Sequence, residues 1–141
     1  IPTPSADVPE ADGALCKAFS DVMEPFCNDM EGLRFNAALE KIWSVVAHCN
    51  KYIDDSAPWK LCKDPAQKER FATVVYNLCE SLRILSILIY PVMPATSAGI
   101  RLQLGLPELA GNGVLADARN FGLLAAETKI GTVKPLFPRK E

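Results

Sequence analysis

The feature of this sequence that most limits its fold is the helical spacing of its apolar residues. From residue 33 to residue 53 they recur every three or four positions, which gathers them on one face of a helix. The same spacing covers residues 11–28 and 65–91, and a shorter stretch covers 94–105. Pro91 ends the third stretch, since a proline breaks or kinks the interior of a helix. The sequence therefore predicts four helices.

The third of these helices is expected at the centre of the protein. Its second half, "LRILSILIY", is apolar on nearly every side, as in a helix that its neighbours cover. The connections between the predicted helices are short, and short connections favour antiparallel neighbours. We therefore predict an all-α fold, an antiparallel helix bundle that occupies residues 14–127.

The remaining segments lack helical spacing. Residues 1–13 contain three prolines and are expected to form a surface connector, in which Asp12 is a candidate cap for the first helix. Residues 107–122 are rich in glycine and asparagine and are predicted to be irregular. Residues 128–141 carry β-branched residues and two prolines. We expect them to form an extended C-terminal tail that packs on the bundle.

Composition excludes several classes of protein. With 141 residues and 49% hydrophobic content, the chain is expected to form one globular domain. Its 15 Lys and Arg against 17 Asp and Glu exclude a strongly basic, non-specific nucleic-acid coat. No basic stretch followed by an apolar one marks a signal peptide. No uninterrupted apolar run approaches the roughly 20 residues of a membrane helix, so no membrane partner is expected.

Signatures of catalysis are missing as well. The five cysteines include no C-x-x-C pair, which favours scattered reduced thiols over a disulfide or metal framework. The single histidine, His48, has no E-x-x-H partner and no marked nucleophile, so we expect an ordinary place on or near the helix surface. The chain alone is therefore predicted to be inactive as an enzyme. It offers no catalytic, cofactor-binding or metal-binding residue.

Aromatic and basic residues gather where the second predicted helix ends. Flat aromatic rings stack on unpaired RNA bases, with about 1–3 kcal/mol for each base, and lysines bind the flanking phosphates. Alternatively, Trp59 packs on a neighbouring helix as a cap of the bundle, with Pro58 fixing its approach. Local composition leaves both interpretations open. The residues of the candidate platform lie within fourteen positions: Asn50, Lys51, Tyr52, Trp59, Lys60 and Lys63.

Three longer motifs occur in a specific order. They are "FNAALEKIWSVVAHCNKYIDDSAPWKL", then "NLCESLRILSILIYPVMPATSAGIRLQLGL", then "KPLFPR". Together they resemble the anticodon-binding domain of methionyl-tRNA synthetases, with matches over residues 33–106 and 128–139. The N-x-Y and P-W elements are shared more loosely with the cysteine, leucine, isoleucine and valine enzymes. The closing P-L-F-P-R points to methionine.

The resemblance implies a function and its residues. The family attaches methionine to its tRNA using ATP, and its helical domain recognises the CAU anticodon. Trp59 matches the tryptophan that stacks on an anticodon base. Asp54 matches an acidic position that is expected to repel wrong anticodons. Asn50, Pro58 and Lys63 also fall on motif positions, so these five residues form the expected anticodon-binding site.

The chain departs from the family pattern in two ways. One histidine makes an H-I-G-H motif impossible and no K-M-S-K-S occurs, so the catalytic domain is expected elsewhere in a parent chain. That parent would use ATP and methionine, with zinc in its catalytic domain left open, and would act in the cytoplasm or an organelle. A family helix with an N-x-x-x-R pair is expected before Ile1. Without it, we expect an uncovered apolar groove and self-association through that groove.

Two alternatives stay open from the sequence. One is the equivalent domain of another class I aminoacyl-tRNA synthetase, which would bind a different anticodon. The other is a helical protein-interaction module that shares only the bundle, in which Trp59 has no part in RNA binding. The expected partners of the leading interpretation are the methionine tRNA and the catalytic domain of the same parent chain.

Overall fold

The computed structural model describes residues 1–4, 9–109 and 114–137, and within these ranges the chain contains helices and no strand. All four predicted helices form close to their predicted positions. The prediction of an all-α fold is confirmed. In chain order the elements are α1 (Glu10–Glu31), α2 (Phe35–Ser56), α3 (Pro58–Leu61), the 3-10 turn η1 (Pro65–Gln67), α4 (Lys68–Leu88), α5 (Pro94–Leu104) and α6 (Val114–Ala118).

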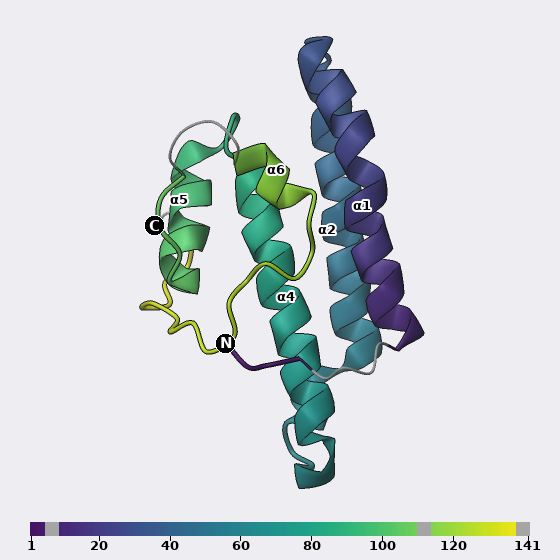
Figure 1. Ribbon diagram of the computed structural model, residues 1–141, viewed down its shortest axis with the longest axis vertical. Helices are drawn as coiled ribbons and strands as arrows, with labels where there is room; N and C mark the ends of the chain where they lie inside the picture. The colour runs from purple at the N-terminus through teal and green to yellow at the C-terminus, as the bar shows by residue number, and fades with distance from the viewer. Residues whose placement is uncertain (5–8, 110–113, 138–141) are drawn as a thin grey trace.

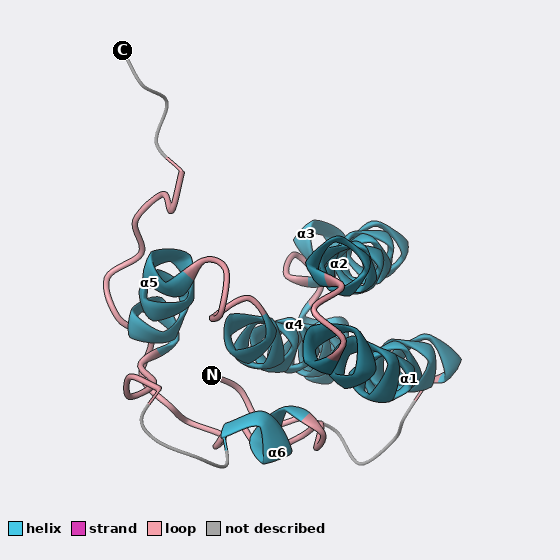
Figure 2. Ribbon diagram, turned by 90° about the horizontal axis from the view of Figure 1, so that it is seen from above, coloured by secondary structure: helices cyan, strands magenta, loops and turns pink. Residues whose placement is uncertain are grey.

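The helices are arranged around α4. Helices α1 and α2 form a long antiparallel pair along one side of α4, and α5 lies on its other side (Figure 1). Seen from above, α6 and the segment after it lie across a third side, while α3 sits beside α2 (Figure 2). The predicted central position of the third long helix is therefore confirmed.

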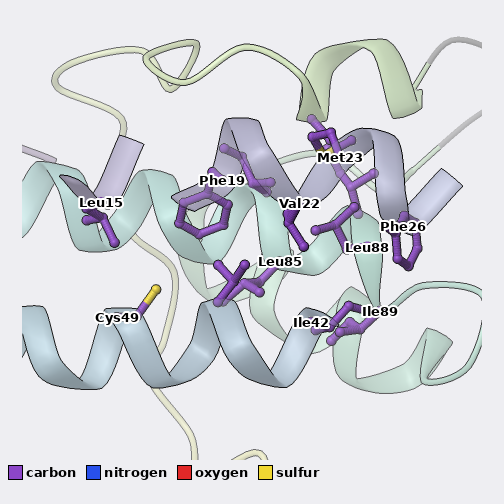
Figure 3. Close-up of a cluster of buried hydrophobic side chains, with 14 of the residues drawn as sticks. Leu15, Phe19, Val22, Met23, Phe26, Ile42, Cys49, Leu85, Leu88 and Ile89 are labelled. Carbon is purple, nitrogen blue, oxygen red and sulfur yellow. The ribbon is translucent and has the colours of Figure 1, made fainter. Parts of the chain in front are cut away.

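The core lies where α1, α2 and α4 meet. Phe19, Ile42 and Leu88, one from each helix, are each about 1% exposed. Figure 3 shows side chains from the three helices pointing toward one another, so that the apolar stripes read from the sequence interlock. Burying apolar surface in this way contributes about 25 cal/mol for each Å² removed from water. The stripes therefore determine which faces of the helices pair.

Helix α4 corrects one expectation. Together with η1 it spans Pro65–Leu88, and these 24 residues are long and apolar enough to cross a membrane. The prediction that no apolar stretch approaches the length of a membrane helix is therefore wrong. However, 67% of its most apolar window is buried inside the protein, as in the core helix of a soluble protein. The helix is apolar on all sides because other elements of the bundle cover most of its surface.

The segment after α5 is more ordered than predicted. Within 107–122, expected to be irregular, Val114–Ala118 forms the short helix α6. The guanidinium group of Arg83 donates hydrogen bonds to the carbonyl oxygens of Asp117 (3.1 Å) and Asn120 (2.8 Å). Contacts with α4 hold this helix, and such long-range contacts leave no periodic signal in a five-residue segment.

The tail lies along α5. The Gly131 amide donates a hydrogen bond to the carbonyl oxygen of Gln103 (2.8 Å), and the Gln103 side chain donates one to the carbonyl oxygen of Lys134 (2.8 Å). A methyl group at Gly131 would lie 2.4 Å from the carbonyl oxygen of Leu102, so only glycine allows this approach. The last residues of the P-L-F-P-R motif, from residue 138 onward, fall outside the described ranges.

Candidate nucleic-acid interface

The candidate site lies where the chain turns from α2 to α4. We call residues 50–70 the corner. Helix α2 ends at Ala57, which has left-handed backbone angles (φ 43°, ψ 58°). The following Pro58 explains this end, because proline disfavours a helical conformation in the residue before it and fits the first turn of a new helix. Pro58 thus starts α3 in a new direction.

Short hydrogen-bonded turns complete the corner. In α3 the Lys60 amide donates to the carbonyl oxygen of Ala57 (2.8 Å), and the Cys62 amide donates to that of Pro58 (3.0 Å). The Asp64 carboxylate then accepts a hydrogen bond from the Ala66 amide (2.9 Å) and caps η1. A proline therefore starts each of these two turns, and backbone hydrogen bonds and one capping contact hold them.

Trp59 faces outward from this corner. Its side chain is 50% exposed, whereas Leu61, two residues later in the same turn, packs against the core. Leu61 therefore supplies apolar contact between α3 and the bundle. Pro58, the first residue of α3, is half-buried. Half of a large aromatic surface thus remains open to solvent.

Polar groups surround the tryptophan along the chain. Asn50 and Asp54 are exposed and lie one helical turn apart on α2, so they share a face. Lys63 is exposed in the turn after α3. Lys51 forms a salt bridge with Asp55 (2.9 Å), which raises the pKa of the lysine. Among the described residues, Lys60 and Lys63 form no salt bridge, so the corner offers positive charge to an anionic ligand.

Beneath this surface lies a buried polar network. Arg70 at the start of α4 donates two hydrogen bonds to the Asp12 carboxylate of α1 (2.7 and 2.8 Å). The Tyr52 hydroxyl of α2 donates a third to Asp12 (2.8 Å) and accepts one from the Asn77 side chain (3.1 Å). Three helices therefore meet at one carboxylate.

This network corrects two expectations. Asp12 is not a helix cap: Pro9 occupies the cap position of α1, and the Asp12 side chain points into the core. Tyr52 is not an RNA platform either, because it is 4% exposed and its hydroxyl is engaged. Burial, together with the neighbouring Asp12 carboxylate, raises the pKa of Tyr52 to about 12. Sequence spacing gave no sign of these contacts, since Asp12 and Arg70 lie 58 residues apart.

The sequence also singled out His48 and the five cysteines. His48 is exposed, and its Nδ1 donates a hydrogen bond to the carbonyl oxygen of Ser44 (2.8 Å), so its predicted helix-surface role is confirmed. The five cysteines are free thiols, and burial raises the pKa of Cys16, Cys49 and Cys79. Across the described ranges, no group of three metal-ligating side chains lies close enough together to hold an ion.

The chain matches known proteins over most of its length. A family model described as the anticodon-binding domain of tRNA ligase matches residues 12–110. A methionine–tRNA ligase of Caldanaerobacter subterraneus subsp. tengcongensis is 39% identical over 139 residues, covering 99% of this chain and 21% of that protein. One of Bacillus subtilis is 37% identical over 137 residues, covering 95% and 20%. The chain thus spans about a fifth of the length of the curated relatives it matches.

Solved structures agree with the sequence matches. The apo form of Mycobacterium tuberculosis methionyl-tRNA synthetase superimposes with a TM-score of 0.86 at 32% identity, covering 100% of this chain and 28% of that one. The same enzyme in complex with methionyl-adenylate gives a TM-score of 0.86 over 99% of this chain. The helix bundle described above is therefore also the fold of the matched part of these enzymes.

Proposed function

Since the chain belongs to the family of anticodon-binding domains of tRNA ligases, we propose that it recognises the CAU anticodon of a methionine tRNA as part of a methionine–tRNA ligase. The observation that carries the proposal is Trp59, a half-exposed ring at the tip of the corner. It stands on the short helix α3, next in the sequence to Lys60 and Lys63, which form no salt bridge in the described structure. Such a surface suits an unstacked base with its flanking phosphates.

Each corner residue has a distinct role in this proposal. Trp59 stacks on an anticodon base, and Lys63 binds a neighbouring phosphate. The Asn50 side chain offers both a donor and an acceptor to a base edge. Asp54, also exposed, places a negative charge where a wrong base or a shifted phosphate would approach. Pro58 holds the turn that presents the ring.

Stem-loops carrying CAU and a scrambled triplet test this proposal. We expect tighter binding of CAU, and Trp59→Ala should weaken it by about 1–3 kcal/mol through lost stacking, about 5–150-fold in affinity. Trp43→Ala is the matched control, since Trp43 of α2 is 52% exposed and lies outside the corner. Equal, strongly salt-dependent affinity for both loops would instead indicate backbone electrostatics and overturn the proposal.

The Asp54→Asn variant tests whether Asp54 repels wrong anticodons or attracts the right one. If Asp54 rejects wrong anticodons, the variant binds the scrambled loop more tightly while its affinity for CAU changes little. Loops with the anticodons of other class I ligases extend this test. Preference for one of those triplets would assign the chain to another ligase.

The wider activity is proposed for a parent chain. We propose that the domain acts with a catalytic domain of the same chain, which uses ATP to attach methionine to tRNA during translation in the cytoplasm. The 141-residue chain alone is then inactive in methionine-dependent ATP–pyrophosphate exchange. Exchange by this chain, purified free of other ligases, would contradict the proposal.

We also propose that this chain self-associates through an apolar groove that is lined by α1, the end of α4 and α6. Tyr90 and Leu115 are large side chains that line this groove and remain 46% and 40% exposed. Exposed apolar area of this kind favours association. Sedimentation should show a dimer that Leu115→Gln weakens, whereas a monomer at all concentrations would exclude it.

A further inference from the structure

The buried carboxylate beneath the corner links three helices at the ends that form it. Asp12 lies in the first turn of α1, Tyr52 in the last turns of α2, and Arg70 in the first turn of α4. All of the contacts are side-chain hydrogen bonds of 2.7–2.8 Å. The end of α2 is therefore held by a directional contact as well as by apolar packing.

The geometry of these contacts leaves little freedom. Arg70 engages both oxygens of Asp12 through its planar guanidinium group, which fixes angle as well as distance. The Asp12 side chain is buried, so moving it away from its partners would leave a charge without compensation. Asn77 donates to the Tyr52 hydroxyl from deeper in α4 (3.1 Å). That hydroxyl is thus held between α1 and α4.

In the sequence, Tyr52 lies midway between two residues of the proposed recognition surface. Asn50 and Asp54 are two residues before and after it, and two residues turn an α-helix by about 200°. The exposed faces of Asn50 and Asp54 are therefore on the opposite side of α2 from the buried Tyr52. Because the helix is rigid over one turn, a rotation at Tyr52 moves both exposed side chains together.

We propose that Tyr52 is a positioning residue for anticodon recognition, acting through Asp12 and Arg70. The inference rests on the proposed function. The hydroxyl holds the end of α2 against α1 and α4, so Asn50 and Asp54 keep a fixed separation from Trp59 on α3. RNA that needs all three contacts at once then binds a surface that is already arranged.

A second buried tyrosine supplies the matched control. Tyr76 of α4 is also nearly buried, and its hydroxyl donates a hydrogen bond to the carbonyl oxygen of Leu124 (2.9 Å). It lies beneath the segment that follows α6, outside the corner. Tyr52→Phe and Tyr76→Phe each remove one hydroxyl from the interior, so they separate a positioning role from general stabilisation.

The test compares both variants for stability and for RNA binding. We expect both to unfold at lower urea concentration than the unmodified chain. Tyr52→Phe should weaken binding of the CAU loop about tenfold and reduce the ratio of CAU to scrambled affinity, because a geometric error in a preorganised site removes several contacts together. Tyr76→Phe should change that ratio less than twofold. Hydrogen exchange of the amides of residues 57 and 59–64 should accelerate in Tyr52→Phe alone.

The outcomes separate this inference from the proposed function. If the unmodified chain does not prefer CAU, the proposed function fails. If it prefers CAU but Tyr52→Phe keeps the preference, or both variants lose it equally, the positioning role is overturned. The Arg70→Lys variant provides a second test, because it keeps the positive charge but removes the planar group that binds both oxygens of Asp12. We expect it to lower the CAU preference by a smaller factor than Tyr52→Phe, and an unchanged preference in both variants would contradict the inference.

Discussion

Asp12 and Glu80 are two buried carboxylates whose partners come from different kinds of structure. Each accepts two hydrogen bonds from an arginine, at 2.7 and 2.8 Å in both pairs. Arg70 lies on a different helix from Asp12, whereas Arg83 follows Glu80 by three residues on α4. The first pair therefore joins helices, and the second is complete within one helix.

The remaining contacts sharpen this difference. Asp12 accepts its third hydrogen bond from the Tyr52 side chain, but Glu80 accepts three from the backbone amides of Gly122, Leu123 and Leu124 (2.7–3.1 Å). Those amides belong to a segment without helical hydrogen bonds, and a buried amide without a partner is costly. The Glu80 carboxylate thus takes the place of the carbonyl oxygens that these amides would bind in a helix or a sheet. Asp12 sets the arrangement of helices beneath the corner.

The largest expected effect is that of Glu80→Gln. The variant leaves Arg83, whose side chain is only 7% exposed, without a charged partner and removes an acceptor from residues 122–124. Breaking a buried ion pair in this way costs about 3–5 kcal/mol in the free energy of unfolding. Urea denaturation measures it.

A double variant serves as the control for Glu80→Gln. Arg83→Met in the same background removes the unpaired charge, but also the hydrogen bonds to the carbonyl oxygens of Asp117 and Asn120. It should therefore recover only part of the loss, as expected for two coupled sites. A loss below about 1 kcal/mol for Glu80→Gln would show that water reaches this pair, and the contrast with Asp12 would disappear.

Asp12→Asn should cost less, about 1–3 kcal/mol. The Arg70 side chain is 25% exposed, so solvent compensates part of its charge after the change. The same denaturation measurement ranks the two variants. If Asp12→Asn were the more damaging of the two, the corner pair would be the main anchor of the fold, and its proposed positioning role would need reinterpretation.

The smallest effect is expected at a third carboxylate, Asp29, near the tip of the α1–α2 hairpin. A hydrogen bond from Lys41, followed by one from Arg34, holds its pKa below the usual range. The unfolded chain therefore binds a proton at higher pH than the folded one. The stabilisation is present above pH about 4 and is lost as the pH falls through the lowered pKa.

Asp29→Asn should accordingly reduce the loss of stability on acidification. Thermal unfolding at neutral pH and at pH about 3 measures the difference. An identical acid response in the variant and the unmodified chain would show that other carboxylates account for it. Arg34 and Lys41 both lie partly in solvent. Asp29 therefore extends the comparison to a carboxylate whose partners need a less precise geometry.

Periodic features of the fold could be predicted from the sequence. Apolar spacing located the four main helices, since burial of one face leaves a repeat of three to four residues. The resemblance to methionyl-tRNA synthetases is confirmed by relatives that match almost the whole chain. Helix α6 was missed because contacts with Arg83 hold it rather than a pattern of its own.

The candidate site was predictable only in part. Motif positions singled out Asn50, Asp54, Pro58, Trp59 and Lys63, and these lie around one corner, although their roles in RNA binding stay predictions. Two predictions for the buried side of the corner were wrong, because Asp12 is not a helix cap and Tyr52 is not exposed to RNA. Their side chains meet Arg70 only after three helices have packed, and a pairing across 58 residues leaves no local signal.

The contact between Glu80 and the segment after α6 also bears on the order of synthesis. The amides that bind Glu80 follow it by 42 to 44 residues. At about 5–20 residues per second, a ribosome needs roughly 2–9 s to make that stretch. In the later part of this interval α4 is complete but still lacks the segment that covers one of its sides. Synthesis of residues 122–124 therefore completes the cover of this side of α4. We expect chaperones to retain nascent chains that are halted before it.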